Sequence, residues 1–303
     1  MPQTPETALE IDLQALAHNY GVIRSRLKEQ TRLLGVVKAF AYGNEAVAIS
    51  RKLENLGADY LAVAFSREGV QLRKSGIRLP ILVLHPQPEG LDEVIEHCLE
   101  PSLYSRRIFS LFLEALEKHR QKEYPVHLKF NTGLNRLGFP EADLNWIGSQ
   151  INASEAVEVR SFFSHLAASD DLGERAYTLG QIRAFENIVQ KSESLLGGRP
   201  FKHLLNTSGV FNYPEAQFDM VRTGIGLYGY SNDPETDRLE TGRVGRDVTQ
   251  DRDGDRDVPG DFAVDRGLAR VEPEPAVGPG HAVERQVKDV RGHRRAEVVV
   301  GDE

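Results

Sequence analysis

Short apolar runs recur along the first 230 residues of the chain, and amphipathic segments separate most of them. Each run is continuous and rich in Val, Leu and Ile, which is typical of strands in a parallel sheet covered on both faces. We expect strands in "RLLGVVKA" (32–39), "YLAVAF" (60–65), "PILVLH" (80–85), "LEPSLYS" (99–105), "VHLKFN" (126–131), "VEVRSFFSHL" (157–166), "FKHLLNTS" (201–208) and "FDMVRTGIGLYG" (218–229). Eight strands with intervening helices predict an α/β fold, a (β/α)8 TIM-type barrel. A doubly wound open sheet is the alternative, but no glycine-rich dinucleotide turn follows the first strand.

The amphipathic segments carry signals for the beginning and end of helices. Between Asp12 and Gln30 the apolar residues fall on one stripe at helical spacing, and Asp12 is placed to cap this helix. Ser105 opens a second segment of this kind, and Gly57 and Gly76 stand where helix C-caps are expected. These signals predict helices that alternate with the strands, as a barrel requires.

Residues 231–303 have a different composition. They contain no tyrosine, no isoleucine and one aromatic residue, Phe262, and their 11 Asp and 7 Glu outnumber 11 Arg and 1 Lys. Stretches such as "DRDGDRDVPGDFAVDRG" (251–267) follow neither helical nor strand period. We therefore divide the chain into a barrel domain, 1–230, and a charged tail, 231–303, that is disordered or frameshifted. The hypothesis of a frameshift rests on the abundance of Val, Arg, Gly, Asp and Ala in this tail, because the codons of these residues mostly begin with G or C. Sequencing the locus tests whether the reading frame is continuous.

Composition narrows the functional class. The 303 residues carry a net charge of −8, which argues against general affinity for nucleic acid or for an anionic membrane surface. No apolar stretch is long enough to span a bilayer, and the N-terminus does not read as a signal peptide. The single cysteine, Cys98, excludes an internal disulfide and a cysteine-based zinc site. We expect a cytoplasmic protein that acts on a small molecule.

Polar residues end the apolar runs repeatedly. In a (β/α)8 barrel the chemistry lies at the C-terminal ends of the strands. The residues found there are Lys38, His85, Lys129, His165, Asn206 and Arg222. A single histidine at a strand end is more often a hydrogen-bonded structural group than a catalyst, and this interpretation is favoured for His85. His203 lies inside its run, where a structural role is expected. The collective pattern nevertheless indicates an active site.

Lys38 is the most informative of these residues. It could be a rim lysine whose stem packs while its amine reaches solvent. It could instead be an amine whose pKa is lowered by desolvation, ready to form a Schiff base. The loops "NTSG" (206–209) and "RTGIG" (222–226) follow the last two strands, where this fold commonly binds phosphate. A Schiff-base lysine beside a phosphate loop suggests pyridoxal 5'-phosphate (PLP) as the cofactor.

Five motifs in order resemble those of the alanine racemase family. "VVKAFAYGNEA" (36–46) is similar to the family's "VKANAYGHG", and "HLKFNTGLNRLGF" (127–139) to "KxDTGMxRxG". "SHLAASDD" (164–171), "HLLNTSGV" (203–210) and "MVRTGIGLYG" (220–229) also fit. The resemblance covers about residues 8–230, and "KAFAYGNEA" looks closest to racemases fused behind a cell-wall ligase in some bacteria. It implies a PLP-dependent isomerase that interconverts L- and D-alanine for peptidoglycan synthesis.

The resemblance also implies roles for individual residues. Lys38 would hold PLP and act as the base on the D-alanine face, and Tyr42 would help to hold the cofactor phosphate. Lys129 would be carbamylated, and the resulting anion would orient Arg136. Arg136 would bind near the phenolic oxygen of PLP and the substrate carboxylate. These assignments make Lys38 and Arg136 catalytic residues.

Further implied roles concern the cofactor ring and phosphate. His165 would flank the pyridine ring and hydrogen-bond toward Arg222, which would face the pyridine nitrogen. A cation beside that nitrogen disfavours its protonation, which favours racemisation over other PLP chemistry. The phosphate would be lined by Asn206, Thr207, Gly224 and Ile225.

The sequence departs from the family pattern in places. Asn131 replaces the aspartate of "DTG", and Phe40 and Asn44 replace an Asn and a His near the lysine. The family's second domain supplies a tyrosine across a homodimer interface as the second base. All nine tyrosines of this chain lie at or before Tyr230. A two-base racemase needs a base on each side of Cα, so we expect impaired racemisation and a doubtful dimer.

Two other functions are weighed against racemisation. A single-domain PLP-binding carrier or homeostasis protein would use the same barrel without racemase activity. A metal hydrolase could use a carbamylated Lys129 with His165 and His85, but such sites usually add a His-x-His pair on the first strand, and this pair does not occur in the sequence.

Overall fold

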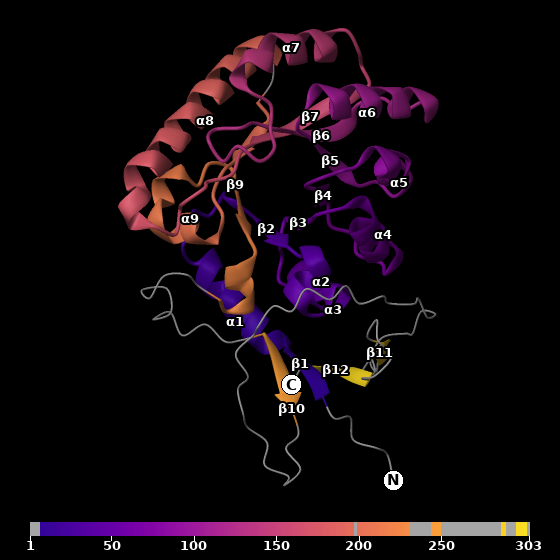
Figure 1. The fold of residues 1–303 in the computed structure, drawn as a ribbon, viewed down its shortest axis with the longest axis vertical. Coiled ribbons are helices and arrows are strands. Elements are labelled where there is room, and N and C mark those ends of the chain that lie inside the picture. Colours follow the sequence, from indigo (N-terminus) through magenta and orange to yellow (C-terminus); the bar gives the residue numbers. More distant parts are fainter. Residues whose placement is uncertain (1–6, 197–198, 231–243, 250–285, 289–294, 302–303) are drawn as a thin grey trace.

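Eight parallel strands close into a barrel in the order β2 to β9 (Figure 1). The computed structural model describes residues 7–196, 199–230, 244–249, 286–288 and 295–301. The barrel strands are β2 (Arg32–Val36), β3 (Tyr60–Val63), β4 (Ile81–Val83), β5 (Glu100–Leu103), β6 (Tyr124–Lys129), β7 (Val157–Phe163), β8 (Phe201–His203) and β9 (Met220–Thr223). The predicted (β/α)8 barrel is thus confirmed, and the open sheet is excluded.

Most strands end earlier than their apolar runs. The run predicted over 218–229 forms a strand only over Met220–Thr223, because Ile225–Tyr228 turns into the short 3-10 helix η5. Leu204 and Leu205 are fully buried although β8 has already ended at His203. Burial continues into the loops at this end of the barrel, so hydrophobicity alone overestimates strand length.

Helices cover the outside of the barrel (Figure 1). They are α1 (Leu13–Arg24), α3 (Ala46–Asn55), α4 (Ser66–Lys74), α5 (Leu91–Glu96), α6 (Arg106–Lys118), α7 (Leu144–Asn152) and α8 (Arg175–Leu196). The short elements α2 (Lys38–Gly43) and α9 (Thr207–Asn212) follow β2 and β8 at the C-terminal ends of these strands. The other short 3-10 helices are η1 (Pro88–Gly90), η2 (Glu141–Asp143), η3 (Leu172–Glu174) and η4 (Pro214–Ala216). None of the helices in the described residues has the length and apolar character needed to cross a membrane.

The predicted helix caps are present. The Asp12 side chain accepts hydrogen bonds from the backbone N–H groups of residues 14 and 15, and the Ser105 hydroxyl accepts one from Ile108. Gly57 and Gly76 follow α3 and α4 with φ of +84° and +86°, a conformation that glycine adopts without strain. The first helix ends at Arg24 rather than at the expected Gln30.

The barrel wall separates two layers of side chains. Alternate residues of each strand point outward and pack against the helices in the main hydrophobic core. On the inner side, a second apolar cluster fills the part of the barrel lined by β2, β3, β4 and β9; its buried members are Leu34, Val36, Tyr60, Ala62, Leu82 and Met220. The part lined by β5 to β9 also holds buried polar side chains, and these lead to the candidate site.

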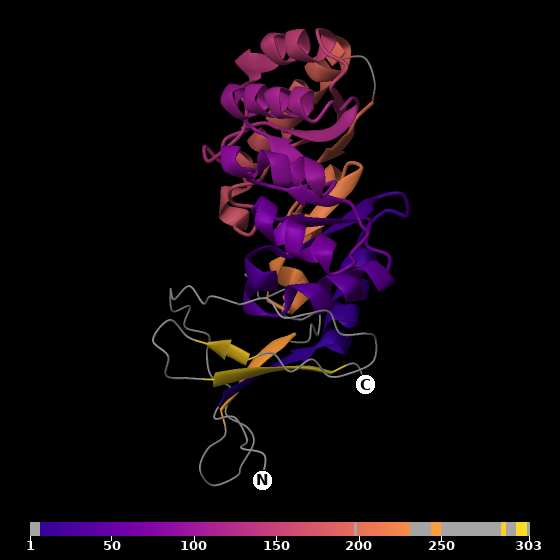
Figure 2. The ribbon, with the colours of Figure 1, turned by 90° about the vertical axis from the view of Figure 1, so that its right-hand side faces the viewer.

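A small four-stranded sheet lies at one end of the long axis of the molecule (Figure 2). It consists, in order across the sheet, of β10 (Gly245–Thr249), β1 (Thr7–Asp12), β12 (Arg295–Gly301) and β11 (Gln286–Lys288). β1 pairs antiparallel with β10 and parallel with β12. The composition of residues 231–303 predicted a disordered or frameshifted tail and did not predict β10, β11 and β12. The segment 251–267, which follows neither helical nor strand period, lies outside the described residues.

Candidate active site

The residues predicted from the strand ends gather at the C-terminal mouth of the barrel. Lys129 is the last residue of β6, Arg222 lies in β9, Lys38 follows β2 by two residues, and His165 follows β7 by two. Arg136 lies on the loop between β6 and η2. These groups are close enough for their charges to interact: the charges of Arg222, Arg136 and Lys38 each lower the pKa of Lys129. The structure therefore assembles one strongly basic site.

A left-handed turn presents Lys38. Four consecutive residues, Ala39 to Tyr42, have φ between 52° and 58°. L-residues in this conformation are each disfavoured by about 1–2 kcal/mol. The Glu68 carboxylate accepts a hydrogen bond from the Ala39 N–H at 2.7 Å and from the Ala64 N–H at 2.6 Å, which ties the turn to the start of α4. Sequence reasoning missed Glu68, whose only local signal is its position in the first turn of a helix.

The environment of Lys38 lowers the pKa of its amine. Burial lowers the pKa of Lys38, the nearby Arg136 guanidinium lowers it further, and the Glu68 carboxylate partly opposes both. The Lys38 Nζ lies 5.9 Å from the centre of the Tyr42 ring. A lysine with a lowered pKa is the form that attacks a carbonyl group and accepts a proton.

Lys129 is a buried cation among cations. Its side chain is 6% exposed, and burial lowers its pKa to about 8, with Arg222, Arg136 and Lys38 each contributing in the same direction. Its Nζ lies 5.7 Å from the centre of the Phe163 ring. This environment would be better satisfied by an anion at the tip of Lys129 than by an ammonium group.

Arg222 is held at the mouth of the barrel by several acceptors. Its guanidinium donates to the backbone carbonyls of Ser164, His203 and Leu204 at 2.5–3.0 Å and to the His203 Nδ1 at 2.7 Å. It also donates to the His165 Nδ1 at 3.4 Å, in line with the expected contact between these residues. Burial lowers the pKa of Arg222 to about 9, which still leaves it charged at neutral pH.

His165 is uncharged in this setting. Burial lowers its pKa to about 3, and the Arg222 and Arg136 charges act in the same direction. A neutral His165 can accept the hydrogen bond from Arg222 at one ring nitrogen and keep a proton on the other. Its neighbour Ser164 donates or accepts a hydrogen bond with Thr132 at 2.8 Å, which ties β7 to the loop that carries Arg136.

The two glycine-containing loops form a cradle at the ends of β8 and β9. A Cβ atom on Gly224 would lie 2.3 Å from the Tyr42 hydroxyl, and one on Gly226 would lie 2.3 Å from the Thr207 methyl group. The Thr207 hydroxyl oxygen accepts hydrogen bonds from the backbone N–H groups of Gly224 and Gly226 at 3.3 and 3.4 Å, which leaves the hydroxyl proton to donate to an anion. Burial raises the pKa of Tyr42 to about 12, so its hydroxyl remains a donor. These donors suit a phosphate group.

Asn206 and Ile225, the other residues predicted to line the phosphate, lie on the same two loops, but their side chains are placed differently. The Asn206 side chain caps α9 by accepting from the Gly209 N–H at 2.9 Å, and it also accepts from the Ser169 hydroxyl at 2.7 Å. Ile225 is 40% exposed. Asn206 thus builds the turn, whereas Ile225 presents its side chain outward.

Arg136 is exposed on a loop with a defined base. Asn131 accepts from the N–H groups of Gly133 and Asn135 at 3.1 and 3.0 Å, and its amide donates to the Asn135 side chain at 2.8 Å. Asn131 therefore fulfils the turn-forming role open to an aspartate at this position. The Arg136 guanidinium is near enough to the site for its charge to lower the pKa of Lys38 and of His85.

The histidines do not assemble a metal centre with acidic partners. Among the residues that the structure describes, no group of three or more His, Cys, Asp or Glu side chains is placed to hold a metal ion. His85 contacts the Gln87 amide at 2.9 Å and packs against the rings of Phe65 and Tyr104. These contacts agree with the structural role expected for His85.

Comparison with known proteins identifies relatives over the barrel. The family model described as "Alanine racemase, N-terminal domain" matches residues 11–232. Alanine racemase 1 of Oceanobacillus iheyensis is 34% identical over 222 residues, 73% of this chain and 59% of that protein. The alanine racemase of Synechocystis sp. is 37% identical over 227 residues, also 73% and 59%. The chain thus spans about 60% of the length of these curated relatives.

Solved structures show the same fold. The alanine racemase of Clostridium difficile 630 in complex with cycloserine superposes with a TM-score of 0.77 at 31% identity, covering 82% of this chain and 69% of that chain. The alanine racemase from the D-cycloserine-producing Streptomyces lavendulae also gives a TM-score of 0.77, at 27% identity, covering 97% of this chain and 72% of that chain.

Proposed function

Because the chain belongs to the alanine racemase family, we propose that it binds PLP at the mouth of the barrel and acts there on alanine, as a racemase that interconverts the L- and D-forms. The observation that carries the proposal is the Lys38 amine, whose pKa is lowered and which shares its turn with Tyr42, the residue that contacts Gly224 of the cradle. The strong basicity of the site suits a cofactor and a substrate that are both anionic.

The residues present fit PLP. Lys38 would hold the cofactor through its amine. In the cradle, the Tyr42 and Thr207 side chains pack directly against Gly224 and Gly226, and their hydroxyl groups are donors for a phosphate. Asn206 and Ile225 complete the predicted phosphate loops. Bound PLP supplies an electron sink that makes the Cα proton of an amino acid acidic.

Proton transfer is the task of the chain's own residues. Lys38, whose pKa is lowered by burial, would take the Cα proton on one face and return it. Arg222 would face the pyridine nitrogen, where its charge disfavours protonation of the ring and so limits the reaction to rapid return of the proton. His165 would flank the ring as a neutral side chain, and exposed Arg136 would bind the substrate carboxylate.

We further propose that Lys129 carries a carbamate. The Lys129 ammonium loses one proton, and the neutral amine attacks CO2, forms the N–C bond as one C=O π bond opens, and releases a second proton. The two steps convert a cation into an anion beside Arg222, Arg136 and Lys38. Without CO2, the lowered pKa means that the unfolded chain binds more protons between about pH 8 and 10.5, so the free energy of unfolding rises through that window.

Bicarbonate is therefore expected to stabilise the chain by about 1–3 kcal/mol at pH 8, the scale of a charge-assisted interaction, and to flatten the rise with pH. Urea unfolding with and without bicarbonate measures this effect, and mass spectrometry under native conditions detects the added CO2. In Lys129→Met both signals should vanish. Equal stabilisation of the unaltered chain and Lys129→Met would contradict the carbamate.

Reductive trapping tests the cofactor proposal. PLP added to the purified chain should give the visible absorption band of lysine-linked PLP, and borohydride followed by peptide mapping should place the pyridoxyl group on Lys38. Alanine incubated in D2O should then exchange its Cα proton. Labelling spread over surface lysines, without a band, would overturn the proposal. A band without exchange would instead favour a PLP carrier.

Some features of the proposal concern the whole protein. Racemisation also requires a second base on the opposite face, which in this family is a tyrosine of a dimer partner, and residues 231–303 contain no tyrosine. We propose that the barrel supports exchange of the Cα proton on the face that Lys38 serves. We also propose that the barrel domain ends near residue 230, that the protein is cytoplasmic and that its D-alanine serves peptidoglycan synthesis.

A further inference from the structure

A chain of hydrogen bonds crosses the barrel interior and ends on Arg222. It links one side chain from each of five consecutive strands, β5 to β9: Glu100, His127, Ser161, His203 and Arg222. The Glu100 carboxylate lies 2.7 Å from the His127 Nε2, and the His127 Nδ1 lies 2.6 Å from the Ser161 hydroxyl oxygen. The same hydroxyl oxygen lies 2.8 Å from the His203 Nε2, and the His203 Nδ1 lies 2.7 Å from an Arg222 guanidinium nitrogen.

When each histidine ring carries one proton, the two ends of the chain allow only one direction for its protons. An arginine can only donate, so the His203 Nδ1 accepts and the His203 proton is on Nε2. That proton points to the Ser161 hydroxyl, which therefore donates its own proton to the His127 Nδ1. The His127 proton is then on Nε2 and points to Glu100, whose carboxylate can only accept. Every donor thus has an acceptor.

Burial makes the opposite direction of the hydrogen bonds costly, because a buried donor without an acceptor destabilises the fold. His127, Ser161 and His203 are fully buried, and Arg222 is 5% exposed. Burial lowers the pKa of His203 well below its ordinary value, which keeps the ring neutral with a single proton. If the chain ran the other way, the His203 Nδ1–H would face an Arg222 N–H at 2.7 Å, and two buried donors would compete for one position.

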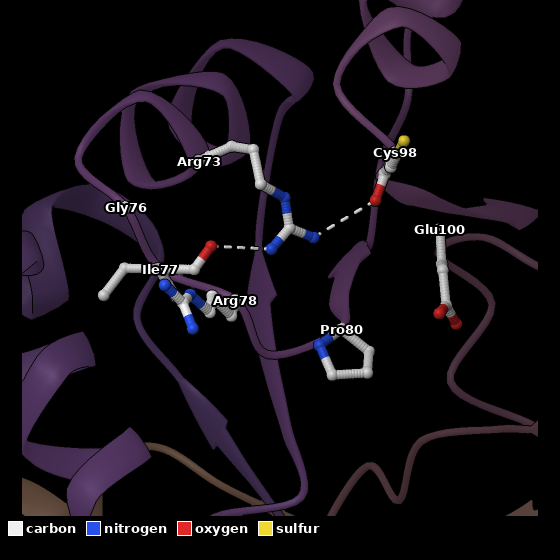
Figure 3. A pocket seen from close by; sticks show the side chains of 7 residues that line it. All are labelled: Arg73, Gly76, Ile77, Arg78, Pro80, Cys98 and Glu100. Carbon is white, nitrogen blue, oxygen red and sulfur yellow. Dashed lines mark hydrogen bonds between the residues drawn. The ribbon is translucent and has the colours of Figure 1, made fainter.

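Glu100 lies at the end of the barrel opposite the candidate active site. It is the first residue of β5 and lines a cavity of about 530 Å³ together with Arg73, Arg78 and Cys98 (Figure 3). Arg73 is already bonded to the backbone carbonyls of Ile77 and Cys98 at 2.8 and 3.1 Å, as Figure 3 shows. The carboxylate of Glu100 is thus on the far side of the barrel from the residues proposed to bind PLP.

We propose that Glu100 is a positioning residue for Arg222. Arg222 already requires the His203 Nδ1 to accept. Through His127 and Ser161, Glu100 supplies the acceptor at the other end of the chain, so that every donor is satisfied in this direction. Glu100 thereby stabilises the His203 tautomer that holds the guanidinium at the mouth of the barrel. The importance of that position for catalysis rests on the proposed function, in which Arg222 faces the cofactor ring. The chain of hydrogen bonds itself concerns the protein without cofactor.

Two variants interrupt the chain in different ways, and the barrel offers a matched control. Ser161→Ala removes the central link. Glu100→Gln keeps the shape at the end of the chain but replaces a pure, charged acceptor by a group that can also donate, so the direction is then fixed only at Arg222. Ser102→Ala makes the same change as Ser161→Ala at another fully buried position, where, within the described residues, the serine hydroxyl has no hydrogen-bond partner.

Nitrogen-15 NMR of the histidine rings, on the full chain without PLP, reads the tautomers directly. In the unaltered chain and in Ser102→Ala, His127 and His203 should each show a single tautomer with the proton on Nε2. Glu100→Gln should show mixed tautomers at His127, because the pure acceptor for its Nε2–H is lost, while Arg222 keeps the His203 proton on Nε2. In both variants the guanidinium protons of Arg222 should exchange with solvent about tenfold faster, the effect of losing one typical buried hydrogen bond.

The outcomes separate positioning from general stabilisation. A His203 proton on Nδ1 in the unaltered chain, or tautomers and Arg222 exchange in Glu100→Gln that match the unaltered chain, would overturn the proposal. Because Glu100 lies at the rim, this second criterion applies even if Ser161→Ala does not fold. Failure of PLP to bind would leave these signals unchanged and would count against the proposed function alone. With PLP bound, a shifted visible band in Glu100→Gln but not in Ser102→Ala is expected.

Discussion

Replacing Lys38 by alanine is expected to slow the exchange of the alanine Cα proton with solvent by about 10³-fold or more in the presence of PLP. Lys38 is the amine whose pKa is lowered by burial and by Arg136, and its loss removes both the attachment point and the proton acceptor. Proton NMR of alanine in D2O measures the rate by the decay of the Cα signal. The visible band of lysine-linked PLP should disappear as well.

Two controls separate the chemistry of Lys38 from a loss of structure. Lys202→Ala removes a partly exposed lysine of β8, whose amine contacts Glu193 at 3.3 Å, and should leave exchange unchanged. A small primary amine such as methylamine, added to Lys38→Ala, should restore part of the exchange rate because the site still holds the other residues. An exchange rate in Lys38→Ala within a few-fold of the unaltered chain would rule out Lys38 as the base.

The barrel could be predicted from the sequence because its information is local. Each strand is a short Val-, Leu- and Ile-rich run, and side chains such as Ser105 and Gly57 mark helix ends within a few residues. The position of Lys38, Lys129 and Arg222 at strand ends then predicts that they meet at one mouth of the barrel. The limits of the strands were less predictable, since buried loop residues such as Leu204 continue the apolar runs.

Much of the site's support could not be predicted, because it depends on contacts between distant segments. Glu68 stabilises the turn at Ala39 from another strand–helix unit, 29 residues away. His203 was expected to be structural and Ser161 was not singled out, although the two link Glu100 to Arg222. Nothing in a run of alternating inward and outward residues indicates which inward polar groups meet. That information arises only when five strands close side by side.

Gly138→Ala is expected to lower the free energy of unfolding by about 3 kcal/mol or more. Gly138 has φ of +132°, and a Cβ atom there would lie 2.6 Å from backbone atoms of Phe130 and Asn131. Backbone cannot move aside as a side-chain tip can, because the Asn131 N–H is bonded to the Phe139 carbonyl at 2.9 Å and the Phe139 N–H to Lys129 at 2.8 Å. The substitution should therefore open the base of the loop that carries Arg136.

Gly57→Ala is the matched control for that change. Gly57 also has a positive φ, +84°, but a Cβ atom there meets nothing within 4 Å, so only the conformational strain of about 1–2 kcal/mol is expected. Urea unfolding of both variants compares the two losses. Because the Gly138 loop adjoins Lys129 and bears Arg136, Gly138→Ala should also weaken the response to bicarbonate, whereas Gly57→Ala should not. Equal losses of stability would mean that the loop relieves the overlap by moving as a unit, and that its base does not fix Arg136.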